Sequence, residues 1–311
     1  MSEFTITPVA GQVAAAGNGQ NARDALNAAL RAALRHPRFE VLPLVGTAEL
    51  VEQHLSHSIP VTVTASPRQG LEPTLVVTEA LARLGFPAVP HVAARLIVDE
   101  SHLVEVLHRL DEAGVRDVFV VGGDGDRPVG CFRDALTLLT AIQRLRNCGV
   151  GTSLEQVGIT GYPEGHPLVS DRELIESLAA KQSLATYAVT QMCFDATAVS
   201  RWVSRVRRDG ITLPVHVGVA GKIDRRRLMR ISARIGLGDS ARFLRKHRHG
   251  WTRLLLPGIY HPDRLVRDLG ADLARPSRGV AGLHVYTLGA VAATEQWRRQ
   301  ALVRLGDDGL R

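Results

Sequence analysis

Function-capable polar side chains stand at the ends of two apolar, β-rich runs in this sequence. Residues 161–167 (GYPEGHP) follow the run 157–160, and residues 190–195 (TQMCFD) continue the run 187–190. In barrel enzymes that alternate strands and helices, the catalytic groups lie at the carboxyl ends of the strands. Tyr162, His166 and Gln191 are therefore candidate site residues.

Glu40 is a further candidate, because it is the one charged residue in the apolar run 39–43. A carboxylate in such a run either faces the barrel mouth or is buried at a cost. Burial raises the pKa of a carboxyl group and prepares it to act as a general acid near neutral pH. A solvated glutamate at a strand end is the competing interpretation.

Residues 122–128 (GGDGDRP) follow the run 117–121 and form a glycine-rich loop. Glycines allow the backbone to approach a ligand closely, and Asp124 could hydrogen-bond the ring nitrogens of a heterocycle. The loop lacks the GK[ST] signature of a phosphate loop and the later ligands of a calcium site. An ordinary turn rich in Gly and Asp is the alternative.

Three side chains near these strand ends could each serve a specific chemistry. Gln191 offers one acceptor and two donors, which match a lactam or aminopyrimidine edge, although an amide paired with backbone is the alternative. His166 lies near Glu164, but no third ligand follows at metal spacing, and we expect no metal. Cys193 has no evident histidine partner and is predicted to be a core thiol.

Eight apolar, β-branched runs could position these residues, with helical patterns between them. The runs are 39–43, 61–64, 91–98, 117–121, 157–160, 187–190, 214–219 and 282–288. Helices are predicted over 47–52 with a capping Thr47, over 101–113 before Gly114, and over 171–184 with Asp171 as N-cap. This alternation predicts an α/β fold, a single (β/α)8 TIM barrel. An open doubly wound sheet is second, because no GxGxxG follows the first strand.

Two additions to the barrel are expected. Residues 1–36 form an N-terminal extension with a helix over 22–34, and residues 37–311 form the catalytic domain. The long segment between the seventh and eighth runs is predicted to hold helices at 225–235, 240–249 and 262–273. The length of 311 residues suits one barrel with such additions.

Composition limits the classes of function. No apolar run reaches the roughly 20 residues that span a bilayer, and residues 1–19 do not resemble a signal peptide. Three cysteines without CxxC spacing favour a reducing, cytoplasmic compartment. The net charge of +7 is concentrated between residues 201 and 253. Solvated helix faces are the favoured interpretation, ahead of nucleic-acid binding, since no aromatic residues interleave with the arginines; a site that attracts anionic ligands is a third interpretation.

These motifs resemble the methylenetetrahydrofolate reductase family over roughly residues 38–300. Residues 161–167 and 190–195 carry the resemblance, and residues 39–43, 63–64, 90–91, 123–124 and 286–288 fall in the family's order. The resemblance implies a (β/α)8 barrel that reduces 5,10-methylenetetrahydrofolate to 5-methyltetrahydrofolate. It also implies NADH or NADPH as hydride donor and usually a bound FAD.

The resemblance also implies roles for individual residues. Glu40 matches the general acid that protonates the leaving nitrogen of the methylene bridge, and Asp124 matches a catalytic aspartate near the pterin and the flavin. Gln191 matches a glutamine that hydrogen-bonds folate, and Thr64 and Asp124 also contact the substrate. The positions that match the flavin-binding set are Thr64, His91, Gly123, Asp124, Tyr162, His166 and Lys181.

The sequence departs from the family mainly at contacts to the flavin's phosphates, ribose and adenine. Gly122 replaces an arginine, Leu174 replaces a common aspartate, and Ala180 falls in a stretch that is usually basic. An arginine–phosphate contact contributes on the order of 1–3 kcal/mol. FAD is therefore expected to be bound, although its binding could be weakened or lost. If it is, hydride passes directly from NAD(P)H to the folate. An aromatic residue that usually stacks on the ligand aligns with Ile231.

Two other functions remain open at this point. The same site could run in reverse, oxidising methyltetrahydrofolate in one-carbon catabolism. A non-catalytic folate- or nucleotide-binding barrel is the alternative from another class. The choice between NADH and NADPH is open, as is a homo-oligomeric state.

Overall fold

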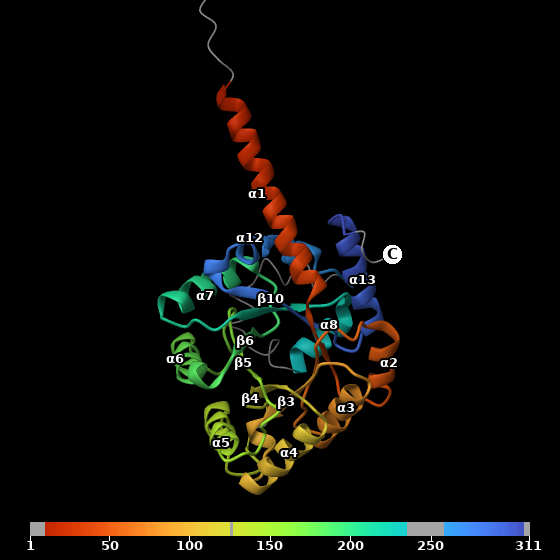
Figure 1. Cartoon of the computed structure of the whole chain (residues 1–311), viewed down its shortest axis with the longest axis vertical. Helices are drawn as coiled ribbons and strands as arrows, with labels where there is room; N and C mark the ends of the chain where they lie inside the picture. The colour runs from red at the N-terminus through yellow and green to blue at the C-terminus, as the bar shows by residue number, and fades with distance from the viewer. Residues whose placement is uncertain (1–9, 125–126, 235–257, 308–311) are drawn as a thin grey trace, which may run out of the picture.

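The β-branched runs of the sequence form strands, and eight of these close into a parallel barrel. The computed structural model describes residues 10–124, 127–234 and 258–307. Around the barrel the strands follow the order β1-β10-β7-β6-β5-β4-β3-β2, so each strand lies beside its neighbour in the chain. Figure 1 shows the helices arranged around this barrel. The predicted (β/α)8 fold is confirmed.

The strands and helices alternate along the whole barrel. The barrel strands are β1 (Arg38–Val41), β2 (Val61–Val63), β3 (Ala88–Ala93), β4 (Asp117–Val121), β5 (Gln156–Gly161), β6 (Tyr187–Thr190), β7 (Val215–Ala220) and β10 (Val280–Tyr286). The helices between and after them are α2 (Thr47–His54), α3 (Glu72–Arg83), α4 (Glu100–Glu112), α5 (Ala135–Asn147), α6 (Asp171–Lys181), α7 (Ala196–Arg208), α8 (Arg225–Arg234), α11 (Asp263–Asp268), α12 (Gly270–Leu273) and α13 (Val291–Arg304).

Several predicted boundaries differ from the structure. The predicted strand 91–98 corresponds to β3, which begins earlier, at Ala88. It ends at Ala93 because Ala94–Leu96 form a 3₁₀ turn. Helix α6 is capped by Ser170 rather than Asp171, since Ser170 and Glu173 form a reciprocal capping box. Thr47 does not cap α2; its hydroxyl donates to the carbonyl of Leu42 at 3.0 Å instead. Gly114, with φ +66°, follows α4 as expected.

The segment between β7 and β10 carries an element that the sequence did not predict. Strands β8 (Ile223–Asp224) and β9 (Ile259–Tyr260) pair antiparallel outside the barrel. Two-residue strands are too short to produce a periodic pattern. The predicted helix 225–235 corresponds to α8, and the predicted helix 262–273 is divided into α11 and α12. The predicted helix 240–249 lies outside the described residues.

The N-terminal helix is longer than predicted and is bonded to the last part of the described chain. Helix α1 (Ala10–Arg35) stands clear of the barrel in its first half and packs against it in its second half, where Leu34 is buried (Figure 1). Arg35 makes two hydrogen bonds to the carboxylate of Asp307, at 2.6 and 2.7 Å. Arg298 of α13 donates to the carbonyl of Leu34 at 2.8 Å. The boundary between an extension and a catalytic domain stays a prediction.

The inside of the barrel is filled by rings and by one charged layer. A Cβ atom on Gly158 would collide with the rings of Tyr187 and Phe119, so these rings fill the interior because residue 158 is glycine. At the amino ends of the strands, Arg38 Nη2 donates to Asp117 at 2.5 Å and to the Tyr187 hydroxyl at 2.8 Å. This buried group fills the amino-terminal end of the barrel, which we call the barrel floor.

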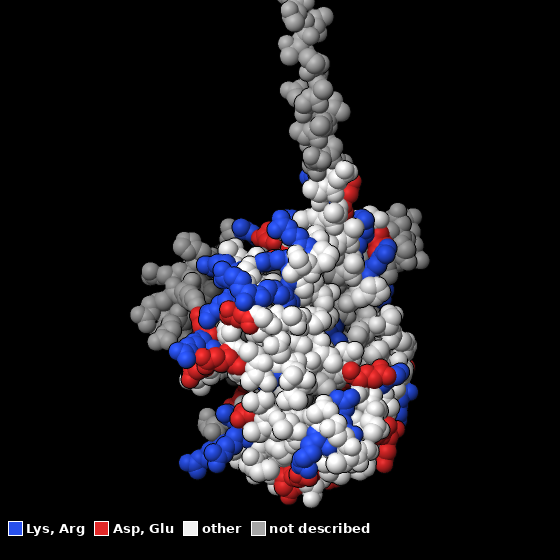
Figure 2. Space-filling model, turned by 60° about the vertical axis from the view of Figure 1, so that its left-hand side comes forward, with Lys and Arg blue, Asp and Glu red and all other residues white. Residues whose placement is uncertain are grey.

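Much of the basic surface is used inside the protein. Figure 2 shows Lys and Arg side chains grouped near the base of the projecting helix. Arg278 pairs with Asp272 at 2.6 Å, and Arg207 donates to the backbone carbonyls of Arg278, Ile211 and Leu213. These two side chains are bound internally and are not solvated, so the interpretation of the basic stretch as solvated helix faces stays a prediction. Residues 245–249, also part of the basic stretch, lie outside the described residues.

The helices of the described residues also bear on membrane insertion. None of these helices combines the length and the apolar character that crossing a bilayer requires.

Candidate active site

Glu40 lies at the carboxyl end of β1, where two histidines meet its carboxylate. The residue is 7% exposed. Its Oε2 is 3.0 Å from Nε2 of His284 on the adjacent strand β10, in a hydrogen bond. Nε2 of His91 on β3 approaches the same oxygen to 3.4 Å but makes no hydrogen bond. The structure thus brings together two predicted residues, Glu40 and His91, and one that was not predicted, His284.

The charge state of Glu40 differs from the expectation. Burial by itself raises the pKa of this carboxyl, but the contacts with His284 and His91 outweigh burial and hold the pKa at about 2. The expected rise is therefore wrong for the protein without ligands. Burial also lowers the pKa of His284, although Glu40 opposes this shift. The resting arrangement is an ionised carboxylate that accepts a hydrogen bond from a neutral imidazole.

Asp124, Tyr162 and His166 form a second group at the strand ends. The rings of Tyr162 and His166 meet edge to face, with centroids 5.3 Å apart. Burial raises the pKa of Tyr162, and the charge of Asp124 raises it further. Burial lowers the pKa of His166, and Asp124 opposes that shift. Loops after β4 and β5 therefore place these three predicted residues within electrostatic reach of one another.

Gly123 shapes the loop that carries Asp124. Its φ of +95° lies in the left-handed region, and a Cβ there would stand 3.4 Å from the Cβ atoms of Ala93 and Arg95. Arg95 donates to the carbonyls of Gly123 and Arg133, at 3.4 and 3.2 Å. The Arg95 guanidinium thus lies beside Gly122, the position at which the family resemblance led us to expect an arginine. Arg95 is far from this loop along the chain, so the sequence did not indicate that its side chain contacts the loop.

Three predicted residues have no described contact with Glu40. Gln191 follows β6, and its Oε1 accepts the N–H of Met192 at 2.9 Å, which leaves Nε2 to donate. Thr64 follows β2, and its carbonyl accepts the Thr74 hydroxyl at 2.8 Å. Lys181 is the last residue of α6; burial lowers its pKa, and Asp134 at the start of α5 opposes that shift.

Cys193 matches its prediction. The thiol is buried, burial raises its pKa, and Sγ donates to the carbonyl of Gln191 at 3.0 Å. It is a core thiol rather than a nucleophile.

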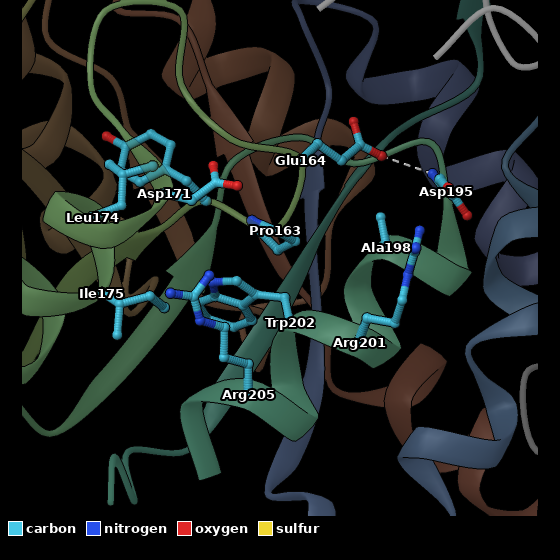
Figure 3. A pocket seen from close by; sticks show the side chains of 11 residues that line it. Pro163, Glu164, Asp171, Leu174, Ile175, Asp195, Ala198, Arg201, Trp202 and Arg205 are labelled. Carbon is cyan, nitrogen blue, oxygen red and sulfur yellow. Dashed lines mark hydrogen bonds between the residues drawn. The ribbon is translucent and has the colours of Figure 1, made fainter. Parts of the chain in front are cut away.

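Glu164 has a structural position that the sequence motif did not disclose. Its Oε1 accepts the N–H groups of Phe194 and Asp195, both at 2.8 Å, and Figure 3 shows the bond to Asp195. Oε2 is buried without a hydrogen bond. Burial raises the pKa of this carboxyl to about 7, although the two N–H groups oppose the rise. Glu164 therefore binds the loop after β5 to the start of α7.

A cavity of about 340 Å³ lies between α6 and α7, next to this loop. Figure 3 shows Trp202 and Arg205 of α7 facing Leu174 and Ile175 of α6 across it. Glu40, His91 and Gln191 do not line it, so we place the candidate active site at the strand ends instead. Among the described residues, no group of histidines, cysteines and carboxylates could hold a metal ion.

Comparisons of the sequence with known proteins match this chain to one family. The family model described as methylenetetrahydrofolate reductase matches residues 38–234. Methylenetetrahydrofolate reductase 2 of Saccharomyces cerevisiae is 27% identical over 241 residues, or 69% of this chain and 36% of that protein. Methylenetetrahydrofolate reductase 1 of Schizosaccharomyces pombe is 28% identical over 207 residues, or 58% of this chain and 30% of that protein. The chain spans about a third of the length of these relatives.

Proposed function

Because the chain belongs to the methylenetetrahydrofolate reductase family, we propose that it is an oxidoreductase that reduces 5,10-methylenetetrahydrofolate to 5-methyltetrahydrofolate. NADH or NADPH is the hydride donor in this proposal. The observation that carries it is Glu40, a buried carboxylate at the carboxyl end of a barrel strand, held by His284 and approached by His91. Barrel enzymes place their proton-transfer groups at such strand ends.

In the proposed step, Glu40 donates a proton to the leaving nitrogen as its bond to the bridging methylene carbon breaks. The iminium that remains on the other nitrogen accepts hydride and becomes the methyl group, while the nicotinamide is oxidised. Glu40 is left as the carboxylate. Since the free enzyme holds Glu40 ionised, the carboxylate must take up a proton before each reduction.

The other strand-end residues would bind and orient the folate. Gln191 keeps its Nε2 donors for the lactam edge of the pterin, because its Oε1 already accepts a backbone N–H. Asp124 is exposed at the mouth and would accept hydrogen bonds from the amino side of the same ring. These two side chains would fix the ring so that the methylene bridge faces Glu40.

The ring end of FAD fits the residues at this mouth. His91, Thr64, Tyr162 and His166 would line the flavin ring. His91 Nε2 is buried without a hydrogen bond and lies 3.4 Å from Glu40 Oε2, so a flavin would contact another edge of this imidazole. When bound, FAD would relay hydride between nicotinamide and folate. For the phosphate end, Arg95 is engaged by two backbone carbonyls and Lys181 is buried. We therefore expect a weakly held flavin, with direct transfer from NAD(P)H as the alternative route.

The test is Glu40→Gln in the full chain. Glutamine cannot donate a proton as an acid, so folate turnover should fall by about 10²-fold or more, with nicotinamide binding unchanged. Glu49→Gln, on the exposed face of α2, is the matched control. Steady-state rates and a visible spectrum of each preparation decide the outcome. Full activity in Glu40→Gln removes the assigned role, and flavin absorbance in the wild type excludes the flavin-free route.

The reverse reaction is the second candidate. Oxidation of methyltetrahydrofolate needs a base that accepts the proton from nitrogen, and Glu40 rests in that ionised form. The ratio of kcat/KM for the two directions, measured with NAD(H) and NADP(H), tells which one the enzyme favours. Folate binding without turnover in either direction would return the non-catalytic barrel as the better proposal.

A further inference from the structure

We propose that His284 is a positioning residue for Glu40. It fixes Oε2 of the carboxylate by a hydrogen bond, so that Oε1 is the oxygen presented to folate. This inference rests on the proposed function, because it concerns the proton-transfer step of that reaction.

The contact between the two side chains is buried. His284 Nε2 lies 3.0 Å from Oε2, with His284 0% exposed and Glu40 7% exposed. The imidazole packs edge to face against Tyr286 at 4.9 Å and parallel to Phe119 at 6.4 Å, measured between ring centroids. These rings fix the direction of the N–H bond, as supporting groups do in pre-organised sites.

His284 acts as a neutral donor and not as a store of protons. Its Nδ1 is buried without a hydrogen bond. Donation from Nε2 makes Nδ1 an acceptor, whereas an imidazolium would bury an unpaired N–H donor as well as a charge. Charged and titratable groups from several strands surround the His284 imidazole and its partner Glu40. They are Arg38 of β1, His91 of β3, Asp117 of β4, His216 of β7 and Tyr286 of β10.

Among the described residues, His284 alone hydrogen-bonds the Glu40 carboxylate. His91 approaches the same oxygen to 3.4 Å without hydrogen-bond geometry, and the remaining oxygen, Oε1, has no hydrogen bond to a described residue. Without the His284 donor, burial should raise the pKa of the Glu40 carboxyl with less opposition. The carboxylate should then take up its proton at higher pH.

The experiment compares His284→Leu, which removes the donor, with His284→Gln, whose amide can donate from nearly the same place. We expect the acid limb of kcat/KM for methyltetrahydrofolate oxidation to rise by at least about one pH unit in His284→Leu. The glutamine variant should restore the wild-type limb. His216→Leu is the matched control, because His216 is an interior histidine that contacts the Tyr187 ring and not Glu40. Should the leucine variant fail to fold, His284→Asn, whose amide falls short of Oε2, replaces it.

An infrared titration of the Glu40 carboxylate, assigned by its loss in Glu40→Gln, gives the same midpoint without turnover. If the wild type turns over no folate but the infrared midpoint rises in His284→Leu, the proposed function fails and the positioning role stands. If folate turns over and neither midpoint moves, the role of His284 is overturned. A lower rate with an unchanged pH profile also overturns it, since that result marks a packing residue.

Discussion

Two neighbouring residues, Arg116 and Asp117, belong to ion pairs that differ in burial. The Arg38 and Asp117 side chains are 11% and 14% exposed at the barrel floor. Arg116 pairs with Glu155 on the outside, where the side chains are 68% and 55% exposed. A buried charge that loses its partner has no water to replace it, whereas an exposed charge is rehydrated.

We therefore expect Asp117→Ala to lower the free energy of unfolding by about 3–5 kcal/mol, because it leaves the buried Arg38 guanidinium without its carboxylate partner. Glu155→Ala should cost no more than about 1 kcal/mol. Urea titrations followed by circular dichroism give both values. Equal effects of the two substitutions would mean that the floor pair is solvated.

At the scale of single residues, the sequence located Glu40 but not its charge state. A carboxyl group inside an apolar run signals burial, and burial alone raises a pKa. The opposing hydrogen bond comes from His284, and only the closing of β10 against β1 places that residue beside Glu40. His284 is also a polar residue in an apolar run, the same signal that identified Glu40. Arg95 is likewise a charged residue in an apolar run, residues 91–98, but its contact with the loop after β4 depends on the path of that loop, which the sequence does not show.

Among the elements, the loop after β5 and helix α7 are joined through Glu164. This carboxyl accepts two N–H groups at the start of the helix and has a pKa of about 7. The unfolded chain ionises near 4.5. Between these two values the folded protein binds the proton more tightly, so the protein loses stability as pH rises from about 4.5 to 7.

Glu164→Gln should abolish that loss. Relative to this variant, the wild type should become less stable by up to about 3 kcal/mol between pH 5 and pH 8, at about 1.4 kcal/mol per pKa unit. Glu176→Gln, on the exposed surface of α6, is the control and should show no such trend. Thermal unfolding at several pH values measures the difference, and parallel curves for wild type and Glu164→Gln would contradict the assignment.

Prediction of the elements succeeded where a local pattern was present. The strands 117–121 and 187–190 were predicted to the residue, because their β-branched runs are bounded by clear breaks. The end of β3 was misplaced, since a 3₁₀ turn continues the apolar run of residues 94–97. The β8–β9 pair joins segments far apart in the chain through two residues each, and such pairing leaves no periodic trace in the sequence.

For the whole molecule, α1 and α13 hold the barrel at one side through buried apolar contacts. Leu34 of α1 is 1% exposed, whereas Val303 of α13 is 58% exposed. Leu34→Ala should destabilise the protein by about 2–5 kcal/mol, and Val303→Ala by less than about 0.5 kcal/mol. Urea unfolding of both variants tests this, and an unchanged Leu34→Ala protein would mean that α1 is dispensable for stability.

The bonds between Arg35 and Asp307 also connect a position near the start of the described chain with one at its end. A force that pulls the two ends of the described chain apart acts first on the packing of α1 and on this doubly bonded pair. The strands are tied to one another all around the barrel, and they are loaded only after that pair ruptures. We therefore expect this pair and the packing of α1 to give way under tension before the barrel strands separate.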